Sequence, residues 1–334
     1  MTSITDHALK DTPVLVTGAT GFIGGHLAQR LAVDEQAAVT GTGRKLDAVP
    51  FLKGVIDLQK ADLLNRDEMT AVVAGKAIVF HVAAWLSTRT DGEEQARRLN
   101  ADAVRELIEI SAEAGVKRFV LVSTIAAYGP PQKICMDEFT PVDTSQPDLY
   151  GKTKAMGEQV ALEAAAKHNI ELTIIRPGMV YGPRSYAWTL GMFNLVKKGV
   201  PTLFGRAEGH AFPVYIDNLC DMLILAAIQP GAVGEAFNAV DTPIDWNQFF
   251  GYYGKMAGRK PRRLPMALAQ TIVVFNKLLG LNVPISRERL KFYQTKTIYP
   301  TKKATAKLAY EQRIDMDEGM AHAEKWLRET GRIK

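Results

Sequence analysis

The stretch Thr17-Gly18-Ala19-Thr20-Gly21-Phe22-Ile23-Gly24 lies near the start of a 334-residue chain and decides its fold class. It follows a short β-branched run, Val14 to Val16, and opens a helical pattern with apolar residues four positions apart. Glycines between a strand and a helix let backbone amides approach a pyrophosphate, and the helix N-terminus adds a favourable dipole. We therefore predict a dinucleotide site here, with a turn needed only for packing as the alternative. The candidate cofactor-binding residues of this turn are Gly18, Thr20, Gly21, Phe22, Ile23 and Gly24.

Strand and helix patterns alternate through the first half of the chain. Further strands are expected at 37–42, 55–58, 77–82, 118–122 and 171–175, and long helices at 93–114 and 149–168. This alternation predicts an α/β fold, a Rossmann-type doubly wound parallel sheet that binds ligands at the carboxyl ends of its strands. Prolines interrupt the pattern after residue 178. We expect a dinucleotide-binding core over 1–178 and a smaller, mainly substrate-binding region over 179–334, with some segments returning to the core.

Composition narrows the class of protein. The net charge is +5, but acidic and basic residues are interspersed, which argues against a nucleic-acid partner. Cys135 and Cys220 are too few for a disulfide framework or a zinc site, so we expect no metal and a reducing cytoplasm. The polar N-terminus lacks a signal-peptide pattern. The apolar stretch from Met266 to Leu281 is too short and interrupted to span a bilayer; we expect a buried helix or pocket wall, with a membrane-surface helix as the alternative.

The end of the second strand bears on the choice of cofactor. NAD-binding chains of this type usually carry an acidic residue there, whereas this chain has Gly43 followed by Arg44 and Lys45. A small residue leaves room for a 2′-phosphate, and a guanidinium binds phosphate bidentately. We therefore expect NADP(H) rather than NAD(H), with Arg44 and Lys45 as phosphate ligands; a merely solvated Arg44 is the alternative.

Tyr150 and Lys154 supply candidate acid/base chemistry. They stand four residues apart on one predicted helix, so they share a face. A phenol has a pKa near 10, and a neighbouring ammonium favours the phenolate. Thr124, at the end of the preceding strand, can donate a hydrogen bond to a reacting oxygen. The three residues form a candidate catalytic triad, with core packing by Tyr150 as the alternative.

Together these motifs resemble the extended short-chain dehydrogenase/reductases, the NAD-dependent epimerase/dehydratase superfamily. The resemblance covers residues 14 to about 220. It is carried by Thr17 to Gly24, Ala61-Asp62-Leu63, His81-Val82-Ala83-Ala84, Val122-Ser123-Thr124 through Tyr128-Gly129, Tyr150 to Lys154, Arg176-Pro177-Gly178 through Tyr181-Gly182-Pro183, and Tyr215-Ile216-Asp217.

The resemblance implies roles for matching positions. Asp62 and Leu63 would contact the adenine, and Ala83 and Ala84 would lie beside the cofactor ribose. Pro177 and Val180 would lie near the nicotinamide, while Tyr150 and Lys154 would bind the cofactor as well as act in catalysis. The family also pairs two long helices with those of a second subunit, which implies a homodimer. By contrast, His81 is expected to be a packed core residue and Asp217 a helix N-cap.

Departures from the family pattern narrow the chemistry. Dehydratases of the family carry acidic residues after the catalytic Ser/Thr, but Ile125-Ala126-Ala127 follows Thr124, which argues against elimination. Many nucleotide-sugar members carry Arg-Asp where this chain has Ala211-Phe212-Pro213. The remaining resemblance is to the 3β-hydroxysteroid dehydrogenase and dihydroflavonol reductase-like branch. Candidates for an apolar substrate wall, or alternatively core, are Met179, Tyr181, Trp188, Met192 and Phe193.

We therefore expect an NADP(H)-dependent oxidoreductase that reduces a ketone or aldehyde of a fairly apolar small molecule, or oxidises the corresponding secondary alcohol. Two alternatives stay open: a nucleotide-sugar epimerase with bound NAD, and a non-catalytic dinucleotide-binding regulatory protein.

Overall fold

A seven-stranded parallel sheet forms the centre of the protein. The structure is a computed structural model that describes residues 4–86, 92–279 and 287–333. The sheet order is β11-β6-β5-β4-β1-β2-β3, and every neighbouring pair is parallel. The bounds are β1 Pro13–Thr17, β2 Ala38–Gly43, β3 Asp57–Lys60, β4 Ile78–His81, β5 Arg118–Val122, β6 Glu171–Pro177 and β11 Glu235–Ala239. The predicted doubly wound α/β fold is confirmed.

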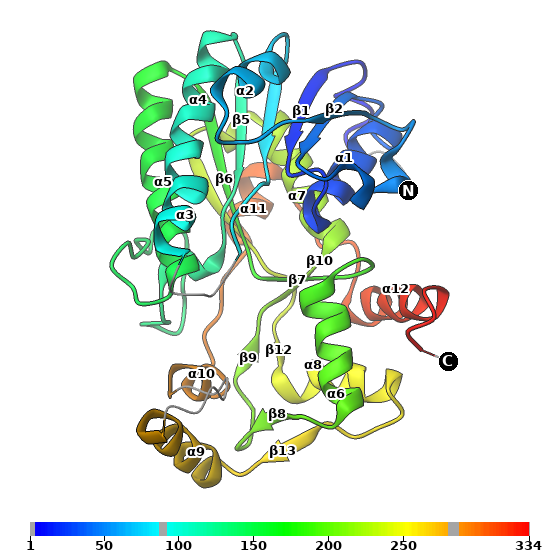
Figure 1. Cartoon of the computed structure of the whole chain (residues 1–334), viewed down its shortest axis with the longest axis vertical. Helices are drawn as coiled ribbons and strands as arrows, with labels where there is room; N and C mark the ends of the chain where they lie inside the picture. The colour runs from blue at the N-terminus through cyan, green and yellow to red at the C-terminus, as the bar shows by residue number, and fades with distance from the viewer. Residues whose placement is uncertain (1–3, 87–91, 280–286, 334) are drawn as a thin grey trace.

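Helices cover both faces of this sheet (Figure 1). One face packs against α1 and α7, and the other against α2, α4 and α5. Their bounds are α1 Phe22–Val33, α2 Arg66–Val73, α4 Ala103–Glu113, α5 Leu149–His168 and α7 Ile216–Ile228. Because both faces are covered, the central strands are apolar almost throughout, as in β5, where all five residues are buried.

The strand order reverses between β1 and β4. From β1 the chain proceeds outward to β2 and β3, then returns through α2 to β4 on the other side of β1. Ligands of open α/β sheets bind at such a switch point, outside the carboxyl ends of the strands. The glycine turn after β1 and Ala83 after β4 both lie there.

Several predicted boundaries are confirmed, and one helix differs. The strand at 118–122 and the helix at 149–168 have the predicted bounds, but the helix expected over 93–114 is divided. It consists of α3 Glu93–Arg97, a π-helical turn η4 Arg98–Asp102, and α4. Asn100 lies in this turn, where its buried side chain bonds to groups outside the helix. The π-helical turn thus coincides with a polar side chain whose hydrogen bonds go to residues outside the helix.

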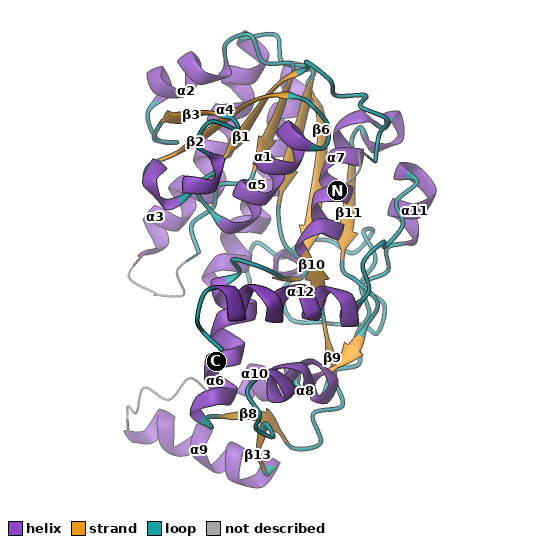
Figure 2. Ribbon diagram, turned by 90° about the vertical axis from the view of Figure 1, so that its right-hand side faces the viewer, coloured by secondary structure: helices purple, strands orange, loops and turns teal. Residues whose placement is uncertain are grey.

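The remaining elements lie largely beyond the carboxyl ends of the sheet strands (Figure 2). Small strand pairs are formed by β7 with β10, β9 with β12, and β8 with β13. These strands are β7 Met179–Tyr181, β8 Pro201–Phe204, β9 His210–Ala211, β10 Pro213–Tyr215, β12 Ile244–Asp245 and β13 Arg262–Leu264. The helices are α6 Met192–Lys198, α8 Trp246–Met256, α9 Met266–Leu279, α10 Arg287–Phe292, α11 Lys302–Leu308 and α12 Met316–Glu329. Short turns are η1 Leu46–Ala48, η2 Pro50–Leu52, η5 Ile125–Tyr128, η6 Tyr186–Gly191 and η7 Pro230–Ala232.

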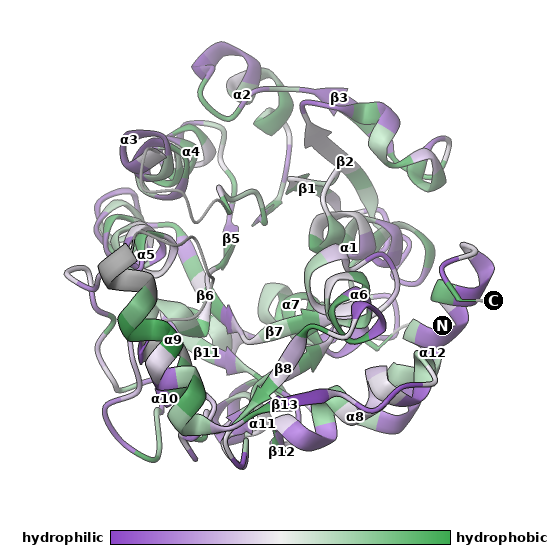
Figure 3. Cartoon of the chain, turned by 60° about the horizontal axis from the view of Figure 1, so that its bottom comes forward, coloured by the Kyte–Doolittle hydropathy of each residue, from purple (hydrophilic) through white to green (hydrophobic). Residues whose placement is uncertain are grey.

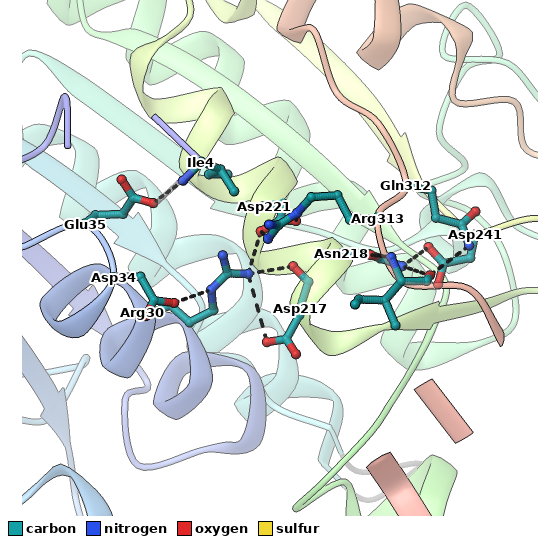
Figure 4. Close-up of polar contacts among 11 residues, drawn as sticks. Ile4, Arg30, Asp34, Glu35, Asp217, Asn218, Asp221, Asp241, Gln312 and Arg313 are labelled. Atoms are coloured by element: carbon teal, nitrogen blue, oxygen red, sulfur yellow. Dashed lines mark hydrogen bonds and ion pairs between the residues drawn. The ribbon is translucent and has the colours of Figure 1, made fainter. Parts of the chain in front are cut away.

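A buried charge network ties α1 to α7 and to the loop before α12 (Figure 4). The Arg30 guanidinium donates to Asp34 at 3.2 Å and pairs with Asp221. Asp221 also accepts two hydrogen bonds from Arg313, at 2.6 and 2.9 Å. The expectation that Asp217 caps a helix is wrong: Tyr215 is the N-cap of α7, and Asp217 lies in its first turn. The main-chain oxygen of Asp217 accepts from Arg30, which gives this segment a packing role.

Helix α9 departs from the prediction for its segment. The expected buried helix or pocket wall carries three exposed apolar side chains, Leu268, Val274 and Phe275. Residues 280 and 281 of the predicted stretch lie outside the described part of the chain. Over the described ranges, every helix is too short or too polar to cross a bilayer.

Candidate active site

The glycine turn brings β1 against the segment that follows β4. Gly18 has a φ of +70°, and a Cβ added to it would lie 2.8 Å from backbone atoms of Ala83. A Cβ at Gly24 would lie 2.3 Å from the carbonyl oxygen of Gly18. Both positions therefore require glycine, one for its conformation and contact and the other for the close approach of α1 to the turn.

The N-terminus of α1 is free to accept an anion. Its N-cap, Gly21, has no side-chain cap, and the first turn holds no acidic residue. The amides of the first helical turn have no intrahelical partner, and the helix dipole favours negative charge there. Phe22 and Ile23 contribute these amides from partly buried positions. The turn and helix thus fit the pyrophosphate of a dinucleotide.

The end of β2 differs in one respect from the prediction. Gly43 ends the strand as expected, but a Cβ there would lie 2.2 Å from the Thr20 hydroxyl. The glycine is therefore required by the packing of Thr20, so its small size is no independent sign of a 2′-phosphate. Arg44 and Lys45 are both exposed, and neither is ion-paired with a described carboxylate.

Asp62 and Leu63 follow the edge strand β3. The Asp62 carboxylate is exposed and accepts from the amide of Leu64 at 3.0 Å. The side chain of Leu63 packs against the apolar cluster beneath α2 and α4. Its backbone is therefore the part of Leu63 that remains for contact with a base.

The other positions expected near the cofactor lie at the ends of inner strands. Ala84 is exposed after β4, whereas Pro177 ends β6 and is buried. Val180 is buried in β7, which follows β6 directly. Ala84, Pro177 and Val180 thus lie at or just beyond the carboxyl ends of β4 and β6, at the edge of the sheet that also bears the glycine turn.

Helix α5 carries Tyr150 in its first turn and Lys154 one turn later. Asp148 caps the helix by accepting from the Gly151 amide at 2.7 Å. The Tyr150 hydroxyl lies near Thr124, which follows β5, and that side chain acts to lower the pKa of the phenol. The Lys154 ammonium donates to the carbonyl oxygen of Val122, the last residue of β5, at 2.7 Å. The structure thus brings Thr124, Tyr150 and Lys154 together at the end of one strand.

The acidity of Tyr150 differs from the sequence-based expectation. Burial raises the pKa of its phenol to about 12, the hydrogen bond from Thr124 opposes the rise, and the charge of Asp148 adds to it. The Lys154 ammonium, which was expected to favour the phenolate, donates to the carbonyl oxygen of Val122. The phenol is therefore protonated at neutral pH.

The Lys154 ammonium is buried, and its positive charge is only partly balanced by nearby negative charge. Burial lowers the pKa of its ammonium to about 8, and the negative charge of Glu158 partly offsets that effect. An ammonium has three protons to donate, and the bond to Val122 uses one of them. Two donors remain for ligand oxygens near the end of β5.

Asn100 fixes the position of α5, and sequence reasoning missed it. Its side-chain amide donates to Thr153 of α5 at 3.0 Å and to the carbonyl of Trp85 at 3.1 Å, and its oxygen accepts from the Trp85 amide. A Cβ at Gly157 would lie 2.1 Å from the Asn100 carbonyl, so α5 and the π-helical turn are in close contact. The sequence did contain a signal for this role, since a polar residue such as Asn100 on an apolar helix face needs a hydrogen-bond partner.

A second missed feature is a buried ion pair behind the site. Arg176 makes hydrogen bonds of 3.0, 3.1 and 2.6 Å to the carboxylate of Glu158 on α5. It also donates to the Tyr128 hydroxyl at 2.8 Å, and Tyr128 donates to Asn238 of β11 at 2.8 Å. This chain of bonds connects α5 to β6, η5 and β11.

His81 is a packed residue, as expected. It is fully buried, and its Nδ1 lies 2.9 Å from the Thr17 hydroxyl. Burial, together with the charge of Lys154, lowers the pKa of its imidazole to about 3. The ring is neutral at physiological pH and serves to fix Thr17, whose oxygen also accepts from the amides of Val82 and Ala83.

Comparison with known proteins identifies the family. A sequence profile described as the NAD dependent epimerase/dehydratase family matches residues 14–239. The chain belongs to the NAD dependent epimerase/dehydratase family. The family supports an NAD(P)-dependent enzyme of the extended short-chain dehydrogenase/reductase type, which the motifs resemble.

Relatives within the family differ in the reaction their names describe. A 3-beta-hydroxysteroid dehydrogenase of Mycolicibacterium neoaurum is 28% identical over 336 residues, covering 92% of this chain and 89% of the relative. A UDP-glucose 4-epimerase of Vibrio cholerae is 28% identical over 237 residues, covering 68% of this chain and 70% of the relative. Among solved structures, that of gox2253 has a TM-score of 0.81 at 25% identity and covers 97% of this chain and 100% of that one.

Proposed function

We propose that this family member is an NADP(H)-dependent reductase of a ketone or aldehyde carried by a fairly apolar small molecule. The observation that supports this most directly is that Thr124 and Tyr150 lie together at the end of β5, close enough for the Thr124 hydroxyl to act on the pKa of the Tyr150 phenol. Two hydroxyl donors at one point suit a single carbonyl oxygen, as in an oxyanion hole. Lys154 and the glycine turn lie at the same edge of the sheet.

Each residue takes a separate part in this proposal. Thr124 and Tyr150 hold the carbonyl oxygen, and Tyr150 donates a proton to it as negative charge develops there. The nicotinamide cofactor, when bound, supplies the hydride. Lys154 donates its two remaining protons to ribose hydroxyls and orients the cofactor. A phenol whose pKa is raised to about 12 carries its proton at neutral pH, which favours the reductive direction.

Two observations favour reduction over nucleotide-sugar epimerisation. The dehydrogenase relative covers 92% of this chain and the epimerase relative 68%, so the similarity to the dehydrogenase extends through the region expected to contact substrate. The chain also has Ala211-Phe212-Pro213 where many nucleotide-sugar members of the family carry Arg-Asp. We propose that residues 179–334 supply most substrate contacts. Within them Met179, Tyr181 and Phe193 are buried core, which leaves Trp188 and Met192 as the partly buried candidates.

The preference for NADP(H) rests on Arg44 and Lys45. They follow β2, where the ribose of the adenosine half would lie, and their charges have no described carboxylate partner. The substitution Arg44→Ala is expected to weaken NADPH binding by roughly 10-fold or more, because a charge-assisted phosphate contact is worth about 1.5–3 kcal/mol. NADH binding should change little. Fluorescence titration with both cofactors measures this, and equal losses would overturn the assignment.

The decisive experiment for the reaction is Tyr150→Phe. The wild type should consume NADPH, followed as loss of absorbance at 340 nm, with some member of a panel of ketones and aldehydes. The variant should lose turnover by ~100-fold or more and keep its NADPH affinity, since it lacks only the donated proton. Unchanged turnover would remove Tyr150 from the mechanism.

The two alternatives give different results in the same assay. An epimerase would show no net change at 340 nm and would convert UDP-glucose to UDP-galactose with retained NAD. A non-catalytic binder would hold the dinucleotide and turn over no substrate.

We further propose a cytoplasmic homodimer formed through α4 and α5. Both helices lie on one face of the sheet, and α5 exposes Leu162. Cys135 and Cys220 are unpaired, which suits a reducing compartment. Sedimentation equilibrium of the wild type and of Leu162→Glu tests the interface; a monomeric wild type would contradict it.

A further inference from the structure

The positive charge of this chain is concentrated in one segment. From residue 246 to 287 there is no Asp or Glu, and there are seven Lys or Arg residues. The whole chain has 41 basic and 36 acidic residues, so the rest of it carries 34 against 36 and is slightly negative. The net charge of +5 therefore originates in the part of the chain that contains α8, β13 and α9.

The same segment presents an apolar helix face to solvent. In α9, Ala269 is fully buried and Met266 and Val273 pack against the main core, so one side of the helix is anchored. The opposite side exposes Leu268 by 49%, as well as Phe275 seven residues later, also by 49%. Figure 1 shows α9 at the end of the molecule remote from the central sheet, and Figure 3 shows green along part of α9 and purple on β13, the strand that leads into it. A helix apolar on both sides is normally covered on both.

Five exposed cations lie at the end of α8, in the turn that follows it and in β13, which leads into α9, and none of them is neutralised by an ion pair with a described residue. They are Lys255, Arg259, Lys260, Arg262 and Arg263. Arg259 and Arg263 donate to the main-chain carbonyls of Lys197 and Gly205, which orients them but leaves their charge uncompensated. No described carboxylate forms an ion pair with any of the five.

We propose that α9 and these five cations dock onto the surface of an anionic phospholipid membrane. The exposed side of α9 enters the boundary between headgroups and acyl chains, and the cations contact lipid phosphates. A second copy of this chain would bring like charges together across the interface, which disfavours self-association through this face. An exposed apolar helix face combined with unpaired cations in the preceding segment is typical of a membrane-surface element. An enzyme held there would meet apolar molecules that partition into the bilayer.

Co-sedimentation with vesicles tests the proposal on the intact protein. Vesicles of phosphatidylcholine with about a third phosphatidylglycerol should bind the wild type, and pure phosphatidylcholine should bind it at least ~10-fold more weakly. The double variant Lys260→Glu/Arg262→Glu should lose ~30-fold or more in affinity, since each cation near the surface contributes about a 5-fold effect. Neither side chain has a bond to another described residue, so the fold should be retained.

The variant Leu268→Glu/Phe275→Glu should also abolish binding. Ile134→Glu, at a side chain 74% exposed far from α9 in sequence, is the matched control and should bind as the wild type does. Absence of binding to anionic vesicles would overturn the proposal. So would binding that the α9 variant leaves unchanged, or a concentration-dependent dimer that this variant dissociates. Unchanged circular dichroism and NADPH binding in each variant exclude misfolding as the cause of a loss.

Discussion

Removing the negative charge of Glu158 should destabilise the protein strongly. The substitution Glu158→Gln keeps the shape of the side chain but leaves Arg176 without its counter-ion. Glu158 is 1% exposed and Arg176 6%, and the wild-type pair is joined by three hydrogen bonds of 2.6 to 3.1 Å. Breaking a buried ion pair from one side costs about 3–5 kcal/mol, because the remaining charge is uncompensated. That is a large part of the ~5–15 kcal/mol that stabilises a typical protein.

Urea unfolding followed by fluorescence of the four tryptophans measures the effect. The control is Glu113→Gln, which breaks a pair with Arg66 that also has two contacts of 2.9 Å but lies on the surface. Its midpoint should stay within error of the wild type, since solvent screens exposed pairs. Similar midpoints for the two variants would refute the argument. Glu158→Leu/Arg176→Met should recover much of the loss, because no unpaired charge is then buried.

The remaining predictions concern packing and pH. Gly157→Ala should lower the thermal unfolding midpoint and reduce turnover by ~10-fold or more. The added Cβ would lie 2.1 Å from the Asn100 carbonyl oxygen and displace α5. Gly251→Ala in α8 meets no atom within 4 Å and should stabilise by up to about 1 kcal/mol; thermal unfolding and initial rates compare the two. Burial raises the pKa of Asp241 from its ordinary value of 3.8 to about 7. The folded state therefore retains a proton that the unfolded state releases between pH 4 and 7. The contribution of Asp241 to the free energy of unfolding consequently falls as pH rises through this range. The urea midpoint of Asp241→Asn should therefore rise relative to that of the wild type between pH 4.5 and pH 7.5. A difference that stays constant with pH would contradict the raised pKa of Asp241.

Much of the fold was predictable because local patterns decide it. The glycine turn, the buried run of β5 and the helix from Leu149 to His168 each have a strong local signal, and the structure has all three. The order of strands follows from right-handed crossovers between parallel neighbours. The interruption at Arg98–Asp102 was not predicted, because it depends on contacts of Asn100 with Trp85 and Thr153, which lie far apart in sequence.

The candidate site was predictable in its composition but not in its electrostatics. Spacing placed Tyr150 and Lys154 on one face of a helix, and the structure places Thr124 beside Tyr150. The contact of Lys154 was not predicted, because a sequence does not show that its ammonium donates to the Val122 carbonyl. The role of Gly43 was also misjudged, since the contact with Thr20 is a tertiary one.

The ion-pair network around Arg30 affects whether part of the chain can fold as a separate fragment. A fragment that ends at residue 178 would keep α1 and its guanidinium but lose Asp221, the carboxylate of α7 that neutralises it. It would also lose β11 and leave β6 as an unprotected sheet edge. Residues 1–178 and the remainder are therefore expected to unfold as one cooperative unit, and a shortened protein made for binding studies should aggregate unless the second part is supplied in trans.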